Sequence, residues 1–201
     1  MSRKLVAGQG VYEKGIYPVM VGDKLALNYR LWCGMLNRCY SERYHKKQPT
    51  YIGCSVSEEF KYFQQFAEWC DTQTGFGNKG WQLDKDIICR GNKQYNSESC
   101  SFIPRQINSL LLDCGAVRGL YPVGVSLNSG NGKLQVHIRK KGKSYHLGFY
   151  DLVEDAAEAY REAKELYVKE IAKEYKSQIN VRVYEALVDW KVDINLTNRG
   201  E

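Results

Sequence analysis

The polar side chains between residues 121 and 150 have types that could do the chemistry of nucleic-acid recognition. Lysine and arginine neutralise phosphates, while asparagine, glutamine, arginine and histidine hydrogen-bond to base edges. From Arg118 to Tyr150 there are six lysines and arginines, two histidines and no carboxylate. We therefore predict that this segment contacts double-stranded DNA. The candidate contact residues are Ser126, Asn128, Lys133, Gln135, His137, Arg139, Lys141, Lys143, Ser144 and His146.

A sheet is needed to place these side chains on one face. Apolar and polar residues alternate over 123–128, 134–139 and 144–149, with turn sequences at 129–132 and 141–143. The alternation predicts a three-stranded antiparallel meander with one apolar face and one basic face. Tyr145, Leu147 and Phe149 are expected on the apolar face. A strand ribbon fits the major groove of DNA, and the alternative is a solvated polar face without a partner.

A helix is predicted directly after the sheet, running to about Tyr175. Asp151 and Glu154 form a capping pattern at its start, and its first turns are rich in carboxylates. Small alanines would let the helix approach the sheet closely. The residues expected to cover the apolar face of the sheet are Ala156, Ala159, Tyr160, Ala163 and Tyr167.

Three segments of this half resemble a known family. They are GKLQVHIR (132–139), YHLGFY (145–150) and EDAAEAY (154–160). Together, over about residues 120–173, they look like the DNA-binding domain of plant ethylene-response factors (the APETALA-like domain), which also occurs in phage and mobile-element endonucleases. The resemblance implies that the sheet reads the major groove through arginine, tryptophan and glutamate positions. Those positions hold Ser126, Asn128, Leu134, His137, Arg139, Ser144 and His146 here, and only Arg139 keeps the residue type of the family.

The first half of the chain begins with helical patterns. A helix is predicted from Asp23, and a second helix is expected to open at a capping box formed by Ser55 and Glu58. The apolar stripe of the first consists of Leu25, Tyr29, Trp32, Leu36 and Cys39. That of the second consists of Phe60, Phe63, Ala67 and Cys70.

A strand, a turn, a second strand and a helix are predicted next. The strands are expected at 81–89 and about 100–103, and Pro104 suits the first turn of a helix with Ile107, Leu110 and Leu111 on its apolar face. The chain is thus predicted to be an α+β protein, with a last helix at about 179–190.

Several segments of this first half are similar to phage and prophage proteins related to HNH endonucleases. They are WCGMLNRCY (32–40), residues 60–69, LDKD (83–86), YNSESC (95–100) and the Ile107-Asn108 pair. The resemblance implies an HNH-like domain at 1–114 with a degenerate ββα finger. A linker at 115–119, the sheet domain at 120–175 and a C-terminal helix and tail at 176–201 would follow.

The HNH resemblance also implies a possible catalytic site. Such an enzyme needs a general base and a divalent metal. Asp84 keeps the strand aspartate of the family, but Lys85 occupies the place of its catalytic histidine, and a protonated lysine is no base. Asp84 and Lys85 are the catalytic candidates, and Asp84 and Asn108 could hold Mg²⁺. Alternatively, Asp84 and Asp86 cap a turn and pair with lysines, or Lys85 holds a phosphate.

Seven cysteines without a C-x-x-C pair favour reduced thiols in the core of an intracellular protein. A zinc site drawn from Cys39, Cys54 and Cys100 is the alternative. The N-terminus does not have the pattern of a signal peptide, and no stretch approaches the apolar length of a membrane helix. The host cytoplasm or nucleoid is therefore the expected location.

Three functions follow from these patterns. The first is a non-cutting double-stranded DNA-binding protein of phage or mobile-element origin, built on a homing-endonuclease-like scaffold that lacks the catalytic histidine. The second is an active, metal-dependent HNH-like endonuclease. The third is a phage-encoded inhibitor that binds a host protein partner of a defence system.

Overall fold

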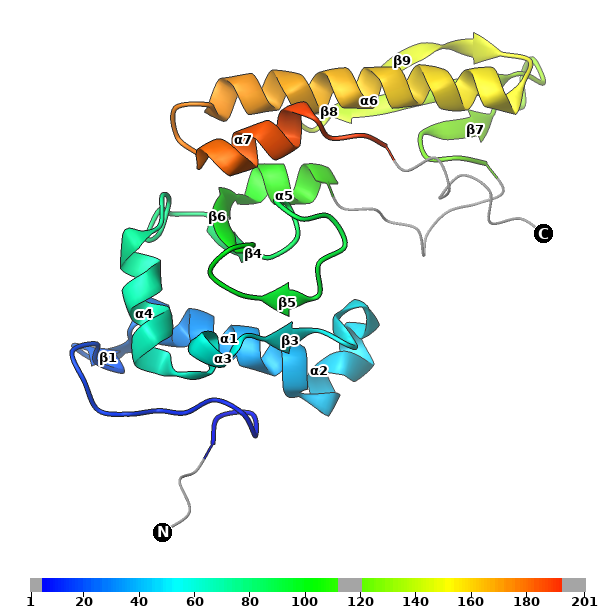
Figure 1. Cartoon of the computed structure of the whole chain (residues 1–201). Coiled ribbons are helices and arrows are strands. Elements are labelled where there is room, and N and C mark those ends of the chain that lie inside the picture. Colours follow the sequence, from blue (N-terminus) through cyan, green and yellow to red (C-terminus); the bar gives the residue numbers. More distant parts are fainter. Residues whose placement is uncertain (1–4, 112–120, 193–201) are drawn as a thin grey trace. The chain divides into compact units, whose positions relative to one another are not determined.

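The computed structural model of the chain describes residues 5–111 and 121–192 (Figure 1). The chain divides into two compact units. Unit 1 comprises the residues up to Asn108 together with Gln178–Ala186, and unit 2 comprises Ser109–Ser177 together with the residues from Leu187 onward. Both units mix helices with short sheets, so the predicted α+β class is confirmed. The predicted linker at 115–119 lies outside the described residues.

Unit 1 is built from helices and three two-stranded sheets. The helices are α1 (Leu27–Tyr40), α2 (Glu42–Lys47), the 3-10 turn η1 (Pro49–Tyr51), α3 (Glu58–Lys61), α4 (Phe63–Thr72) and α5 (Arg105–Leu111), the last of which continues into unit 2. The antiparallel pairs are β1 (Met20–Val21) with β2 (Lys24–Leu25), and β4 (Trp81–Asp84) with β6 (Ser101–Pro104). A parallel pair joins β3 (Ser55–Val56) to β5 (Gln94–Tyr95).

The core of unit 1 is aromatic and lies between α1, α3 and α4. Trp32, Phe60, Phe63 and Phe66 are fully buried, and the Trp32 indole Nε1 donates a 2.8 Å hydrogen bond to the Phe60 carbonyl oxygen. The predicted apolar faces account for much of this core, because Phe60, Phe63, Ala67 and Cys70 are all buried, as are Trp32, Leu36 and Cys39.

The starts of both predicted helices are wrong. Leu25 lies in β2, paired with Met20, and α1 begins only at Leu27. Ser55 lies in β3, and α3 begins at Glu58 after Ser57. In each case residues that the local pattern assigned to a helix pair with another strand, and helix propensity alone does not predict such pairing.

The strand–turn–strand–helix order predicted for 81–111 is confirmed as β4, β6 and α5. The first strand is shorter than predicted and ends at Asp84 rather than residue 89. It ends there because the Asp84 side chain accepts hydrogen bonds from the backbone amides of Asp86 and Ile87, which turn the chain away from the sheet.

Unit 2 contains the predicted three-stranded sheet and the helix that covers it. Strands β7 (Val125–Leu127), β8 (Leu134–Lys140) and β9 (Lys143–Tyr150) are antiparallel in the order β7-β8-β9. Helix α6 (Val153–Tyr175) runs along this sheet (Figure 1). Val136 and Ala156 are fully buried between them, so the apolar face is closed by the helix. The C-terminal helix is α7 (Val181–Val188), which belongs to unit 1 as far as Ala186.

The last strand contains a β-bulge that the alternation did not predict. Val136 pairs with Gly148 and His137 pairs with His146, so Leu147 has no partner in the register. Beyond the bulge the facing of side chains is reversed. Phe149 pairs with Gln135 and is exposed, while Tyr150 pairs with Leu134 and packs against the core. The prediction that Phe149 faces the helix is therefore wrong.

The Tyr160 ring of α6 packs tightly against the backbone at Gly124. This glycine has a φ of 77°, and its carbonyl oxygen accepts a 2.8 Å hydrogen bond from the His137 amide. A Cβ atom here would clash with the Tyr160 ring and lie 2.7 Å from the His137 carbonyl oxygen. The absence of a side chain at Gly124 therefore lets Tyr160 pack on the sheet.

We expect Gly124→Ala to lower the free energy of unfolding by about 2 to 4 kcal/mol, because it adds backbone strain to overpacking. Gly132→Ala is the matched control. Gly132 has a φ of 69°, but its Cβ would meet open space. It should cost only about 1 kcal/mol of strain. Urea denaturation of both variants measures the difference, and equal losses would contradict the role of the Tyr160 contact.

Candidate nucleic-acid interface

The face of the unit 2 sheet opposite α6 gathers polar side chains from all three strands. The register places Ser126 opposite Gln135, Gln135 opposite Phe149, and Arg139 opposite Ser144. Directly paired residues of an antiparallel sheet share a face, and the intervening Val136 and Ile138 are buried on the other. We call this surface the open face. It consists of Ser126, Gln135, His137, Arg139, Ser144, His146 and Phe149.

Hydrogen bonds fix the side chains at one end of the open face. Gln135 Nε2 donates to Ser126 Oγ (3.2 Å), and Asn128 Nδ2 donates to Gln135 Oε1 (3.1 Å). Asn128 Oδ1 accepts from the Gly130 amide, so this residue also shapes the turn into β8. The predicted contact residues Ser126, Asn128 and Gln135 therefore form a preorganised amide and hydroxyl row.

An aromatic row crosses the middle of the open face. The His137 and His146 rings, which are directly paired, have centroids 5.0 Å apart. The His146 and Phe149 ring centroids are 4.6 Å apart. Phe149 was not among the predicted contact residues, because strict alternation assigns it to the core. The sequence signal that could have revealed it is Gly148, which has a φ of 144° and stands beside the unpaired Leu147.

Positive charge on the open face comes from Arg139, and a second cation, Lys143, stands at the start of β9 opposite Lys140. Within residues 5–111 and 121–192, neither side chain has an ion pair or a hydrogen bond to a carboxylate. Arg139 is exposed next to Ser144, and Lys143 is exposed at the start of β9. Both cations are therefore available to an anionic partner.

The other lysines of the segment pair with carboxylates. Lys133 Nζ lies 3.0 Å from Asp151, and Lys141 Nζ lies 2.8 Å from Glu174. Lys140 points to the helix side, where its Nζ lies 3.2 Å from Glu170 and 5.0 Å from the centre of the Tyr167 ring. Lys133 and Lys141 were predicted to contact DNA, and in the structure each is paired with a carboxylate. Both side chains keep substantial exposure, and such surface pairs contribute little free energy.

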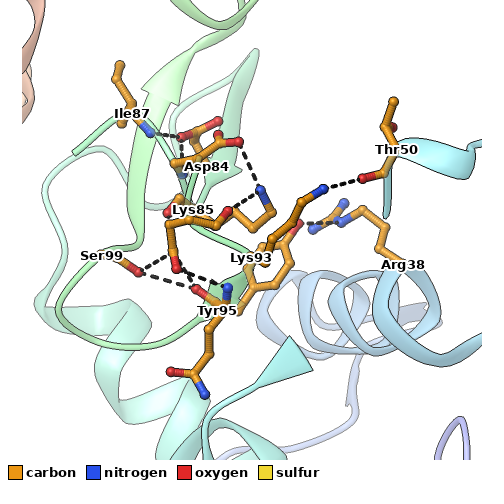
Figure 2. Close-up of polar contacts among 11 residues, drawn as sticks. Arg38, Thr50, Asp84, Lys85, Ile87, Lys93, Tyr95 and Ser99 are labelled. Carbon is orange, nitrogen blue, oxygen red and sulfur yellow. Dashed lines mark hydrogen bonds and ion pairs between the residues drawn. The ribbon is translucent and has the colours of Figure 1, made fainter. Parts of the chain in front are cut away.

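The second predicted site, in unit 1, lies where β4 ends (Figure 2). Asp84 Oδ1 accepts hydrogen bonds from the Asp86 amide (3.0 Å) and the Ile87 amide (2.7 Å). Burial, together with the neighbouring Asp86 carboxylate, raises the pKa of Asp84 to about 6 against the opposing effect of those two amides. The carboxyl group thus caps a turn, as the alternative interpretation of the sequence expected.

Lys85 is tied into the same turn. Its side chain is buried, and Nζ donates to Asp86 Oδ2 (2.9 Å) and to the Asn92 carbonyl oxygen (2.9 Å). Burial disfavours the charged form, but the hydrogen bond and attraction to Asp86 outweigh it and raise the pKa of Lys85. The ammonium group therefore stays protonated at neutral pH and cannot act as a general base.

The donor atoms predicted to hold Mg²⁺ are not brought together as a metal site. Asn108 Nδ2, on α5, donates a 2.7 Å hydrogen bond to Gln82 Oε1, and Asp84 Oδ1 is occupied by two amides. Asp84 is the only carboxylate of these two residues, and the positively charged Lys85 follows it directly in the sequence. Magnesium favours several oxygen donors in octahedral geometry, so this set does not fit it.

The three cysteines of the zinc alternative lie in the core of unit 1. Cys39, Cys54 and Cys100 are buried, and burial raises the pKa of Cys39 and of Cys100 to about 12, which keeps these thiols protonated. In the parts of the chain that the structure describes, no three histidine, cysteine or acidic side chains are placed to share a metal ion. The zinc alternative therefore has no support in this geometry.

Arg38 is a partly buried cation that the sequence analysis did not single out. Its Nε donates to the Tyr95 hydroxyl (3.0 Å), and its guanidinium lies over the Tyr95 and Tyr51 rings at 5.4 and 6.0 Å from their centres. The carbonyl oxygen of Arg38 contacts His45 Nε2 at 2.8 Å. Arginine stacked between aromatic rings is an ordinary way to stabilise a buried guanidinium, so we assign it to the packing of unit 1.

Comparison of the chain with protein-family models, with curated proteins and with solved structures gives no match. The described residues also contain no helix that is long and apolar enough to cross a membrane.

The pKa of Asp84 gives a stability prediction. Its folded-state value of about 6 lies above the ordinary 3.8, so its contribution to stability is complete at low pH and is lost as the pH rises through 6. Asparagine cannot ionise, and its Oδ1 still accepts the two amide hydrogen bonds. We expect Asp84→Asn to raise the free energy of unfolding at pH 7.5 by about 1 to 3 kcal/mol.

The gain should disappear below pH 4, where the wild-type carboxyl is also neutral. Urea denaturation of both proteins at pH 4 and pH 7.5 measures it. Asp86→Asn is the control, because it removes the partner of Lys85 and should destabilise unit 1 at pH 7.5. A variant Asp84→Asn that is less stable than wild type at pH 7.5 would show that ionised Asp84 supports the fold.

Proposed function

We propose that this protein binds double-stranded DNA through the open face of the unit 2 sheet and does not cut it. One observation carries the proposal. The open face presents hydrogen-bonding side chains and the unpaired cation Arg139, with no carboxylate in the sequence from Tyr121 to Tyr150. Phosphates need cations, and base edges need donors and acceptors, and this surface supplies both.

The charge on α6 supports one orientation toward DNA. The carboxylates Asp151, Glu170 and Glu174 neutralise Lys133, Lys140 and Lys141 along the borders of the sheet. An acidic helix side would be repelled by phosphates, whereas the open face would be attracted. The asymmetry therefore favours the sheet, and not the helix, as the element that meets the duplex.

The shape of β8 and β9 also suits a groove. They form a ribbon of seven and eight residues, which spans roughly 25 Å at about 3.3 Å per residue. The two-residue turn between them has positive φ at both Lys141 (47°) and Gly142 (81°), the conformation that matches the right-handed twist of a hairpin. A two-stranded ribbon of this kind is admitted by the major groove.

The nuclease-like sequence of unit 1 fits the same proposal as an inactive scaffold. The histidine position of the resembled HNH family is held by Lys85, whose ammonium is engaged by Asp86, and the Asp84 and Asn108 side chains make hydrogen bonds to other groups of the protein. A phage or mobile-element origin and a host-protein target stay predictions from the resemblance. The described geometry adds no observation that favours a protein target.

We expect Arg139→Gln to weaken binding to a mixed-sequence duplex and to lower the slope of log K against log salt by about 0.9, the value for one lost phosphate contact. Lys140→Gln is the matched control, since it removes one charge at the adjacent residue but on the helix side. Fluorescence anisotropy at several salt concentrations measures both.

The outcome separates the hypotheses. Weakening by Arg139→Gln alone supports the open face. Equal effects of both variants would mean that only net charge matters, and salt-independent or absent binding would direct the search to a protein partner.

We also expect supercoiled plasmid to stay intact with Mg²⁺ or Mn²⁺, because Lys85, at the position of the catalytic histidine of the resembled family, is protonated and held by Asp86. An agarose-gel assay with wild type and Asp84→Ala measures nicking. Cleavage by the wild type that is lost in Asp84→Ala would contradict the proposal and establish an endonuclease with an unusual base.

A further inference from the structure

The β-bulge in β9 is enforced by the chain itself. Leu147 is left without a partner, and Gly148 adopts a φ of 144°, which side chains rarely tolerate. A Cβ on Gly148 would also stand 3.3 Å from the Tyr150 ring. Tyr150 in turn packs against the core cluster that contains Leu134 and Ala156. The bulge therefore has a fixed position, and everything after it in the strand is reversed.

The reversal places a large apolar ring on an otherwise polar surface. Phe149 is 47% exposed and lies beside His146, with Gln135 directly opposite on β8. Burial of the Phe149 ring on the helix side would have stabilised the fold by about 2 kcal/mol. Tyr150 packs on that side instead, and Phe149 is left exposed.

Gln135, directly opposite Phe149, has a side chain held in a position to hydrogen-bond to a base edge. Gln135 is held by Ser126 and Asn128, and Nε2 uses one of its two protons on Ser126 Oγ. Glutamine is the usual partner of adenine in the major groove. The one apolar group that base edges present in that groove is the 5-methyl group of thymine, which pairs with adenine.

We propose that Phe149 packs against thymine methyl groups, so that the open face prefers thymine-containing duplexes. This inference rests on the proposed DNA binding and adds to it the class of base that is read. The ring supplies apolar contact and Gln135 supplies the adjacent amide, so the two side chains together address an A·T pair or neighbouring A·T pairs.

The test uses random-sequence duplexes of one length, synthesised either with thymidine or with deoxyuridine, which lacks only the methyl group. We expect the full chain to bind the deoxyuridine duplex about 4-fold more weakly for each methyl contacted, the factor that corresponds to about 0.8 kcal/mol per buried methyl. Phe149→Ala should bind both duplexes equally, and Phe149→Leu should keep part of the preference.

Tyr145→Ala is the matched control. Tyr145 is 48% exposed on the same strand, but it pairs with Ile138 before the bulge and so lies on the helix side. This variant should discriminate between the two duplexes as the wild type does.

A preference that Phe149→Ala abolishes and Tyr145→Ala retains establishes the contact. Salt-sensitive binding with equal affinity for both duplexes overturns the thymine inference and leaves the DNA-binding proposal standing. A preference that survives in Phe149→Ala overturns it as well, because the methyl group would then be sensed elsewhere. Absence of binding to either duplex overturns both proposals.

Discussion

The packing of α6 on one face of the β7-β8-β9 sheet is the constraint on which the rest of unit 2 depends. A three-stranded sheet has two faces, and only one of them can be closed by a single helix. Val136, Ile138 and Ala156 are buried in this contact, and Gly124 makes room for the Tyr160 ring. Once that face is closed, the paired residues that alternate with the buried ones along each strand must face outward, and they form the open face.

The same helix sorts the positive charges of the sheet. Its carboxylates engage Lys140 and Lys141 at the second turn, and Asp151, just before it, engages Lys133. Arg139 lies one residue from Lys140 but points the other way, because side chains alternate along a strand. Charges that are consecutive in sequence therefore have different surroundings, and Arg139 on the open face has no carboxylate partner among the described residues.

Unit 1 shows how the same residue types can serve structure. Asp84 and Lys85 were predicted from the resemblance to be catalytic candidates, yet their polar atoms satisfy the turn after β4. Buried polar groups must find partners, and here those partners are backbone amides, Asp86 and the Asn92 carbonyl. The polar groups that the sequence suggested for catalysis thus serve to stabilise the turn after β4.

The sequence by itself determined the elements whose patterns are local. The alternation over 123–149, the turn at 141–142 and the alanine-rich acidic helix were sufficient to predict the sheet and its cover, and Phe60, Phe63, Ala67 and Cys70 were correctly assigned to the core. Most residues of the candidate interface were predicted from the alternation of side chains along the strands alone.

Only the tertiary structure decided the features that depend on a distant partner. Pairing with Gly148 and His146 across β8 fixed the bulge and turned Phe149 outward, and pairing with β5 took Ser55 out of its predicted helix. Carboxylates of α6, some thirty residues away in the sequence, form ion pairs with Lys140 and Lys141. Parity and propensity describe neighbours in sequence, whereas register, burial and ion pairing are set by groups that meet only after folding.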